Sequence, residues 1–257
     1  MATTKIDYCD EVRNYVWGCY YCCYYCYAQQ MAKRYARIVA RKEANYTKNQ
    51  GWGDQLVDVL YKRLVDRLYN FKPTFIHSQY AQLLPKKPKI IFLNSMSDPA
   101  FWKKEWYDLI IKKVTENFQH TYLILTKNPD IYTRFSFPHN VWLGVTVENQ
   151  YQLDVFECLL SNRLDLDKLN NKLWLSIEPI TEKVTITPYM KRCIDWIVVG
   201  PQTGTPKITA DPEWIQYFYH SEIPVFMKAA CSKIINTPLR QERPLSLVPP
   251  GYTGGRK

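Results

Sequence analysis

The stretches TYLILTKNP (residues 121–129) and VWLGVTVEN (141–149) are two short apolar runs, and each ends in polar residues. Runs of this length, rich in β-branched and aromatic side chains, are typical of buried strands. Four more runs of this kind occur along the chain: KIIFLNSMSD (89–98), KLWLSIEP (172–179), DWIVVGPQTG (195–204) and IPVFMKAA (223–230). The sequence therefore predicts a series of buried strands.

Segments with helical periodicity lie before or between these runs, at residues 28–46, 53–71, 101–118 and 211–221. Strands that alternate with helices pair in parallel through right-handed crossovers. With PTFIHS (73–78) and a short strand near residues 15–17, the strands number about seven or eight. We therefore expect an α/β fold, a partial or complete (β/α) barrel of TIM type, with a doubly wound open sheet as the alternative.

Each of the first two helical segments is expected to bury an apolar stripe. The stripes are formed by Met31, Tyr35, Ile38 and Val39 in the first segment, and by Leu56, Val59, Leu60, Leu64 and Leu68 in the second.

The composition limits the class of protein. At 257 residues the chain is long enough for one barrel, so we expect a single domain over 1–257 with a loosely structured tail from about residue 245. No apolar run has the length needed to span a bilayer, and a cytoplasmic protein without a membrane partner is expected. The net charge of +10 favours an anionic partner such as nucleic acid, although a solvated lysine-rich surface explains it as well.

Polar side chains follow the predicted strands. In a parallel barrel the carboxyl ends of all strands lie on one rim, where side chains from different strands converge on a ligand. Glu178 and Lys228 are the most informative, because charges at the ends of buried runs are costly unless they are paired. The other residues at these ends are Ser95, Ser97, Asp98, Thr126, Lys127, Glu148, Asn149 and Gln202.

Four of the eight cysteines stand in GCYYCCYYC (18–26). Two abutting CxxC pairs make a tetrahedral zinc site awkward, and a thioredoxin-like CxxC leaves two thiols unexplained. The remaining reading is Cys19-x3-Cys23-x2-Cys26, three thiolates suited to three irons of one cubane cluster with the fourth iron open.

The motif CxxxCxxC, with Tyr25 directly before its third cysteine, resembles the signature of radical S-adenosylmethionine enzymes. GCxxxCxYCYA (18–28) is similar to the spore photoproduct lyase branch and to an uncharacterised, often phage-encoded family related to it. The likeness to that family continues through FLNSMSD, HTYLILTKNP, VWLGVTVEN, LSIEPI, DWIVVG and IPVFMK. The extra Cys22 departs from the pattern and leaves open a slipped loop that uses Cys22 instead of Cys23.

This resemblance implies a [4Fe-4S] cluster on Cys19, Cys23 and Cys26, which binds S-adenosyl-L-methionine and cleaves it reductively to a 5′-deoxyadenosyl radical. It also implies a reductant of flavodoxin or ferredoxin type. The cofactor site is then expected to include Tyr25, Ser95, Asp98, Thr126, Lys127, Glu148 and Glu178. Tyr20, Tyr21, Tyr24 and Tyr25 would form an apolar shell around the cluster.

Lys228 and Cys231 are the candidate catalytic residues on this reading, Lys228 facing the substrate and Cys231 returning a hydrogen atom. The expected substrate is a nucleic acid or nucleotide, because the chain is basic, rich in aromatic side chains and similar to a DNA-repair lyase. The alternatives are a peptide or small-metabolite substrate, or a non-catalytic metal-binding or nucleic-acid-binding module.

Overall fold

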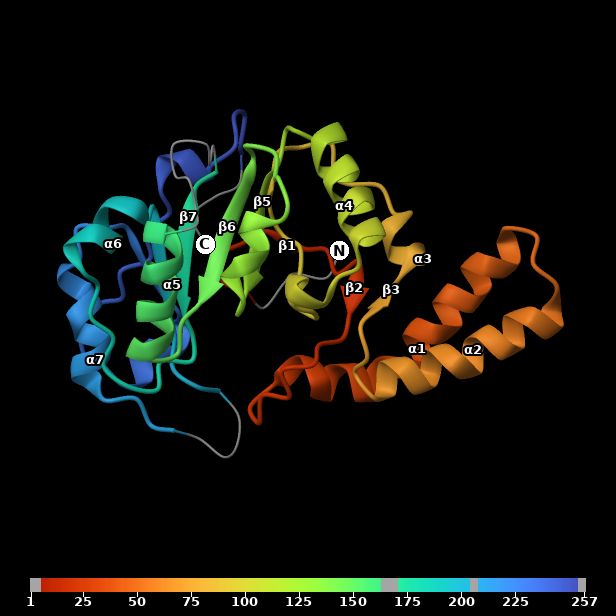
Figure 1. The fold of residues 1–257 in the computed structure, drawn as a ribbon, viewed down its shortest axis with the longest axis horizontal. Coiled ribbons are helices and arrows are strands. Elements are labelled where there is room, and N and C mark those ends of the chain that lie inside the picture. Colours follow the sequence, from red (N-terminus) through yellow and green to blue (C-terminus); the bar gives the residue numbers. More distant parts are fainter. Residues whose placement is uncertain (1–5, 163–170, 204–207, 254–257) are drawn as a thin grey trace.

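Seven parallel strands form the central sheet of the molecule (Figure 1). The computed structural model describes residues 6–162, 171–203 and 208–253. The strands lie in the order β1 (Glu11–Val12), β4 (Ile90–Phe92), β5 (Thr121–Thr126), β6 (Val141–Thr146), β7 (Leu173–Ile177), β8 (Trp196–Val199) and β9 (Val225–Met227). After β1 the order in space follows the order in the sequence, as in a barrel, and the sheet curves into a half-barrel. The prediction of a partial TIM-type barrel is therefore confirmed.

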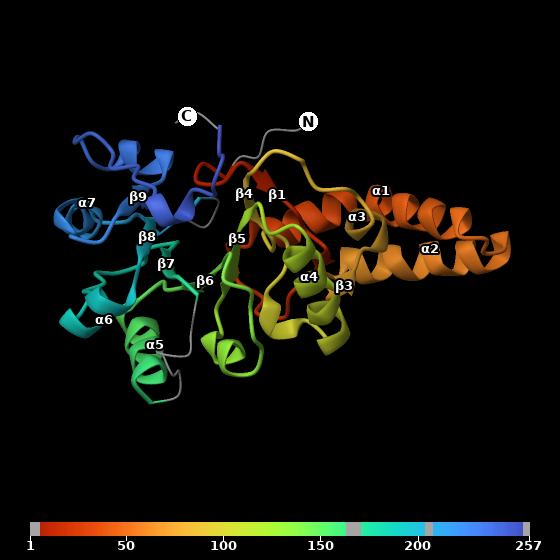
Figure 2. The ribbon, with the colours of Figure 1, turned by 90° about the horizontal axis from the view of Figure 1, so that it is seen from above.

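Helices cover the outer face of this sheet (Figure 2). They are α4 (Lys104–Glu116), α5 (Gln150–Asn162), α6 (Pro188–Cys193) and α7 (Pro212–Gln216). Their buried side chains, such as Ile110, Phe156 and Met190, join the strands in the largest apolar cluster of the molecule. Short 3-10 turns complete the connections: Pro99–Phe101, Pro129–Thr133, Tyr217–His220, Ala229–Lys233 and Leu245–Leu247. Over the ranges that the structure describes, no helix combines the length and apolar character needed to cross a bilayer.

Alternate residues of the strands point into the half-barrel, and the lower part of this lumen is packed with aromatic rings. Trp142, Trp174, Trp196 and Phe226 come from four neighbouring strands, and Tyr8 of the N-terminal segment fits between them. The Trp174 ring lies against β6, where a Cβ atom on Gly144 would come within 2.3 Å of it. Glycine at this position is what allows the aromatic layer to close.

Two short strands stand outside the barrel sheet. β2 (Val16–Trp17) and β3 (Thr74–Phe75) pair only with each other, in antiparallel orientation. The predictions that counted residues 15–17 and 73–78 among the barrel strands were therefore wrong. β1, only two residues long and without a visible apolar run, takes the edge position next to β4.

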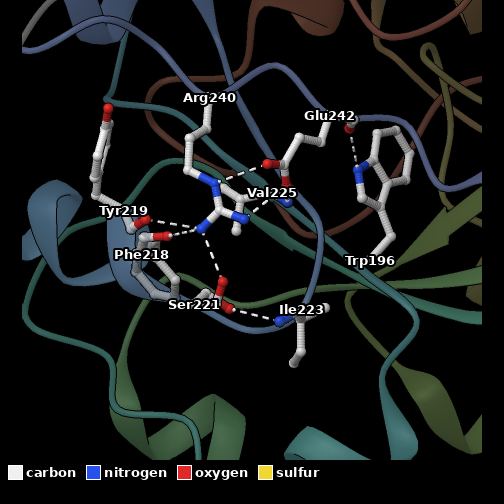
Figure 3. A network of polar contacts seen from close by, with 8 residues as sticks. All are labelled: Trp196, Phe218, Tyr219, Ser221, Ile223, Val225, Arg240 and Glu242. Carbon is white, nitrogen blue, oxygen red and sulfur yellow. Dashed lines mark hydrogen bonds and ion pairs between the residues drawn. The ribbon is translucent and has the colours of Figure 1, made fainter.

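Residues 240–242 pair with β9 and cover the opposite edge of the sheet (Figure 3). The Arg240 guanidinium donates hydrogen bonds to the carbonyl oxygens of Tyr219 and Ser221, both at 2.8 Å, and forms an ion pair with Glu242. The Glu242 carboxylate accepts from the Val225 amide at 3.0 Å. Beyond it the C-terminal segment remains attached, because Leu247 is fully buried. Few strand amides on this edge are left open to another chain.

A helical hairpin projects from the half-barrel (Figures 1 and 2). It consists of α1 (Tyr27–Asn49) and α2 (Asp54–Tyr69). The predicted stripes are wrong in part. Met31 and Ile38 are exposed on α1, and Leu56 and Val59 on α2. Small residues of α1 are buried instead, namely Ala28, Ala32, Ala36, Ala40 and Ala44, so the two helices approach closely.

Glu43 fixes the hairpin to the half-barrel. Its side chain is buried in the last third of α1, and its carboxylate accepts hydrogen bonds from the backbone amides of His77 at 2.8 Å and Ser78 at 2.7 Å. These amides belong to the first turn of α3 (His77–Tyr80), which otherwise leaves them without partners. Burial alone would raise the pKa of Glu43, but the hydrogen bonds from His77 and Ser78 outweigh it and lower the pKa.

The change Glu43→Gln should lower the free energy of unfolding at neutral pH by about 1–3 kcal/mol, because one amide donor loses its acceptor. A carboxylate with a lowered pKa stabilises the fold above its unfolded pKa, and this contribution disappears as the pH falls through the folded value. The difference from the wild type should therefore shrink below roughly pH 4. Urea unfolding across this range, with the exposed Asp58→Asn as control, measures it. A difference independent of pH would contradict the assignment.

Candidate functional site

The cysteine loop lies over the carboxyl rim of the half-barrel. Gly18, which begins the loop, pairs in parallel with Ser97 beyond β4, and its amide donates to the Met96 carbonyl at 2.9 Å. Farther along the loop, the Tyr24 hydroxyl donates to the side chain of Gln202, beyond β8, at 3.1 Å. The loop therefore spans the rim from β4 to β8.

Of the four cysteines in this loop, Cys22 is exposed, whereas Cys19, Cys23 and Cys26 are half-buried. Cys22 has a φ of 53°, in the left-handed region that non-glycine residues seldom adopt. Burial, with smaller contributions from the Asp98 carboxylate and from the Cys23 and Cys26 thiolates, raises the pKa of Cys19 to about 12. Burial also raises the pKa of Cys23 and of Cys26.

Backbone amides contact two of these sulfur atoms. The Tyr21 amide donates to Cys19 Sγ at 3.5 Å, and the Gln29 amide donates to Cys26 Sγ at 3.4 Å. The second of these bonds makes Cys26 the N-cap of α1. Amide hydrogen bonds to the sulfurs are among the features that tune iron–sulfur clusters.

Thiolates are the ligand type that iron–sulfur clusters use, but the thiols of this loop are not gathered into a metal site. Within the described part of the chain, no three Cys, His, Asp or Glu side chains stand close enough together to hold a metal ion. The three thiols would have to turn toward one another and lose their protons on binding iron.

The loop tyrosines form no closed shell. Tyr20 and Tyr24 are 57% and 53% exposed, and Tyr20 and Tyr21 pack edge-on against Phe101. Tyr25 is half-buried and lies edge-on to Tyr24, at a ring distance of 5.1 Å. Tyr25 is thus the loop tyrosine that turns most toward the interior of the rim.

Lys127 and Glu148 form an ion pair at the rim beneath Tyr25. They follow the neighbouring strands β5 and β6, and the Lys127 ammonium also donates to the Tyr25 hydroxyl at 2.9 Å. Burial raises the pKa of Glu148 to about 7 and lowers the pKa of Lys127. A group that changes its protonation near neutral pH thus lies directly under the cysteine loop.

A second ion pair joins Glu178, after β7, to Lys228, after β9. The two side chains meet over Gly200, the residue directly after β8. A Cβ atom on Gly200 would come within 3.0 Å of the Lys228 side chain and 3.4 Å of Glu178. Burial acts to lower the pKa of Lys228, but the Glu178 carboxylate outweighs it and raises the pKa. The costly charges at these strand ends are therefore paired, as the sequence suggested.

Asp98 and Thr126 lie close together, but on the helix side of the sheet. The Thr126 hydroxyl donates to the Asp98 carboxylate at 2.7 Å, which also accepts from the amides of Ala100 and Lys127, each at 2.8 Å. Both side chains are buried, and this carboxylate already has three donors from the protein. The hydrogen bond between Asp98 and Thr126 connects the ends of β4 and β5, and Lys127, the residue directly after β5, is the one that reaches the rim.

Ser95 and Cys231 are likewise engaged by the protein. Asn14 exchanges hydrogen bonds with the Ser95 hydroxyl at 3.0 and 3.2 Å, and the Tyr27 hydroxyl donates to the Ser95 carbonyl at 3.0 Å. Cys231 follows β9 but is fully buried, and its thiol donates to the Val199 carbonyl at 3.6 Å. Burial raises the pKa of Cys231 to about 12.

Sequence reasoning assigned no role to Asn14 or Gln202. Asn14 follows no apolar run, so nothing in the sequence marks it as a residue of the rim. Gln202 stands among the polar strand ends, and it is 2% exposed beneath the cysteine loop. Hollows of about 250 and 440 Å³ exist elsewhere, lined in part by Arg13 and Gln82 and by Pro129 and Leu159, and neither is lined by a loop cysteine.

These features define a class of protein: an α/β half-barrel with charged pairs on its carboxyl rim and a cysteine loop across that rim. The chain belongs to the family described as "Protein of unknown function (DUF5131)", whose model matches residues 3–228. The match includes the cysteine loop and both ion pairs but ends before Cys231. No curated protein and no solved structure matches the chain significantly.

The change Glu148→Gln should alter how stability depends on pH. A carboxyl group whose pKa is raised by folding destabilises the folded state once it ionises, so the wild type loses stability as the pH rises from the ordinary glutamate pKa of 4.5 to about 7. Glutamine does not ionise, so the variant should gain roughly 1–3 kcal/mol relative to the wild type over this interval. Thermal melts across the interval measure the effect. The exposed Glu105→Gln should show no such trend, and a Glu148→Gln curve parallel to the wild type would refute the raised pKa.

Proposed function

We propose that the protein is a radical S-adenosylmethionine enzyme that holds a [4Fe-4S] cluster on Cys19, Cys23 and Cys26. The observation that carries this proposal is the position of the three half-buried thiols, which stand on one loop across the carboxyl rim of a parallel half-barrel. That rim is where barrel enzymes gather their ligands. The exposure of Cys22 supports the x3/x2 assignment over a slipped loop that uses Cys22.

When bound, the cluster and S-adenosylmethionine would supply a 5′-deoxyadenosyl radical for hydrogen abstraction. The residues of this chain would bind and orient the cofactor. Lys127 and Glu148 lie under the loop and can exchange their mutual ion pair for a carboxylate and a hydroxyl or amino group of the ligand. The aromatic layer beneath them, including Trp142 and Trp174, closes the lumen to water from below.

Asp98 and Thr126 have a positioning role in this proposal rather than a contact with the cofactor. Their mutual hydrogen bond, and the bond from the Lys127 amide to Asp98, hold the backbone from which the Lys127 side chain reaches the rim. Glu178 and Lys228 occupy the far side of the rim from Lys127 in the strand order and are available to a substrate. Cys231 would need to be uncovered before it could donate a hydrogen atom, because it is fully buried.

The proposed substrate is a nucleic acid or nucleotide, and the net charge of +10 and the exposed tyrosines of the loop support it. The proposed location is the cytoplasm, where reduced thiols and a reductant of flavodoxin or ferredoxin type are available. A substrate buried in a duplex would have to be extruded to reach the rim, so unpaired strands or free nucleotides should react better.

Alanine variants of the four cysteines test the cluster assignment. After anaerobic reconstitution with iron and sulfide, Cys19→Ala, Cys23→Ala and Cys26→Ala should lose most of the bound iron and the brown absorbance, because each removes one ligand of the cluster. Cys22→Ala is the matched control and should keep both. The wild type should form 5′-deoxyadenosine from S-adenosylmethionine under dithionite.

Loss of iron in Cys22→Ala together with retention in Cys23→Ala would show that the loop uses the other register. A colourless wild-type protein that binds one zinc ion would overturn the enzyme assignment and favour a non-catalytic metal-binding module.

A further inference from the structure

Half of the net positive charge of the chain stands on one helix. Six basic side chains and one acidic side chain give α1 a net charge of +5, out of +10 for the whole chain. The neighbouring helix α2 is neutral, with three residues of each sign. The net charge is therefore concentrated on α1. This helix is one of the two in the hairpin that projects from the half-barrel (Figures 1 and 2).

The basic residues of α1 are exposed, and few of them have acidic partners. The six are Lys33, Arg34, Arg37, Arg41, Lys42 and Lys48. Lys48 pairs with Asp54, and Arg41 lies over the Tyr61 ring at 4.2 Å. In the described part of the chain, no acidic side chain forms an ion pair with Lys33, Arg34, Arg37 or Lys42.

This arrangement costs the helix stability. Lys33 and Arg37, and again Arg37 and Arg41, are like charges four residues apart, and such pairs destabilise an isolated helix. The only acidic residue of α1 is Glu43, which is buried against α3 and does not compensate them. An uncompensated row of cations on a projecting helix is suited to an anionic partner.

The spacing of the cations matches a nucleic acid strand. The five cations from Lys33 to Lys42 lie along roughly 14 Å of helix. A single strand carries one phosphate per ~3.4 Å, which gives a similar density of charge over this length. Apolar side chains are exposed among the cations, since Met31 is 38% and Ile38 is 52% exposed.

The helix also leads directly to the cysteine loop, because Cys26 is its N-cap. Tyr20, Tyr24 and Tyr27 are each more than half exposed at this end. Exposed aromatic rings next to a basic surface are the combination that binds single strands, with the phosphates on the cations and the bases stacked on the rings.

We propose that the outward surface of α1, together with the exposed tyrosines at its base, docks a single-stranded segment of nucleic acid and directs it toward the rim. The destination of the strand rests on the proposed function, whereas the binding itself needs neither cluster nor S-adenosylmethionine. The hairpin thus supplies affinity and the rim supplies chemistry.

The test measures binding of the full chain, without reconstitution, to a fluorescein-labelled single-stranded DNA of about 20 nucleotides, roughly twice the length that α1 spans. The same sequence as a duplex is measured alongside, each over a series of salt concentrations. The single strand should bind more tightly than the duplex, and its affinity should fall steeply as salt rises.

Two paired variants decide whether α1 is the surface. Lys33→Gln with Arg37→Gln should weaken binding by roughly tenfold and flatten the logarithmic salt slope by about 1.4, as expected for two lost phosphate contacts. Lys86→Gln with Lys87→Gln removes the same charge from an exposed segment before β4 and should change the affinity by less than about twofold. Glutamine is a good helix former and removes the repulsion, so the α1 variant should remain folded by circular dichroism. Tyr20→Ala should weaken binding about fivefold without changing the slope.

Equal losses in the two paired variants, or no salt-dependent binding by the wild type, would overturn the docking surface. Tighter binding of the duplex would overturn the assignment of a single strand. Because this measurement uses protein without a cluster, its failure is separate from failure of the proposed function. A protein that assembles the cluster but binds no strand refutes only the docking surface, and one that binds a strand through α1 but assembles no cluster refutes only the enzyme.

Discussion

Parallel pairing of seven strands brings every strand's carboxyl end to the same edge, and the other features of the site depend on this constraint. Both faces of the sheet are buried, one under helices and one under the aromatic layer of the lumen. The strands from β4 to β9 therefore contain no charged residue, and the charged side chains appear just beyond their ends. Lys127, Glu148, Glu178 and Lys228 are brought together in this way, although 101 positions of sequence separate the first from the last.

The lumen beneath this edge is filled by large rings and small residues in layers. Three tryptophans on neighbouring strands occupy the lower layer, and Gly144 leaves the space that one of them needs. Nearer the rim, Gly200 has no side chain and leaves its space to the ion pair of Glu178 and Lys228. The burial of both ion pairs is incomplete, which keeps them within reach of a ligand while the floor excludes water.

Much of the fold could be predicted from the sequence because its strands are long apolar runs with clear ends, as at residues 121–126 and 141–146. β1 could not be predicted, because a strand of two residues at a sheet edge has no recognisable hydrophobic pattern. The stripe expected on α1 failed because close helix packing selects alanine, while the larger Met31 and Ile38 face outward. The sequence predicted that polar residues would lie at the carboxyl ends of the strands. It did not distinguish the residues that face the lumen from their neighbours that face the helices. Thr126 and Lys127 point to opposite faces of the sheet, and the two-residue period of the strand already contained that information.

Cys26 belongs to two parts of the molecule at once. It is the last thiol of the cysteine loop, and its sulfur accepts the amide hydrogen bond that starts α1. Glu43 holds this stiff helix in its last third, 17 residues from Cys26 and six from Asn49, so the helix acts as a lever with the sulfur on its long arm and the hairpin tip on its short arm. Any force or partner that tilts the hairpin must displace or break the bond at Cys26. The conformation of the cysteine loop is therefore coupled to any movement of the far end of α1, some tens of ångströms away.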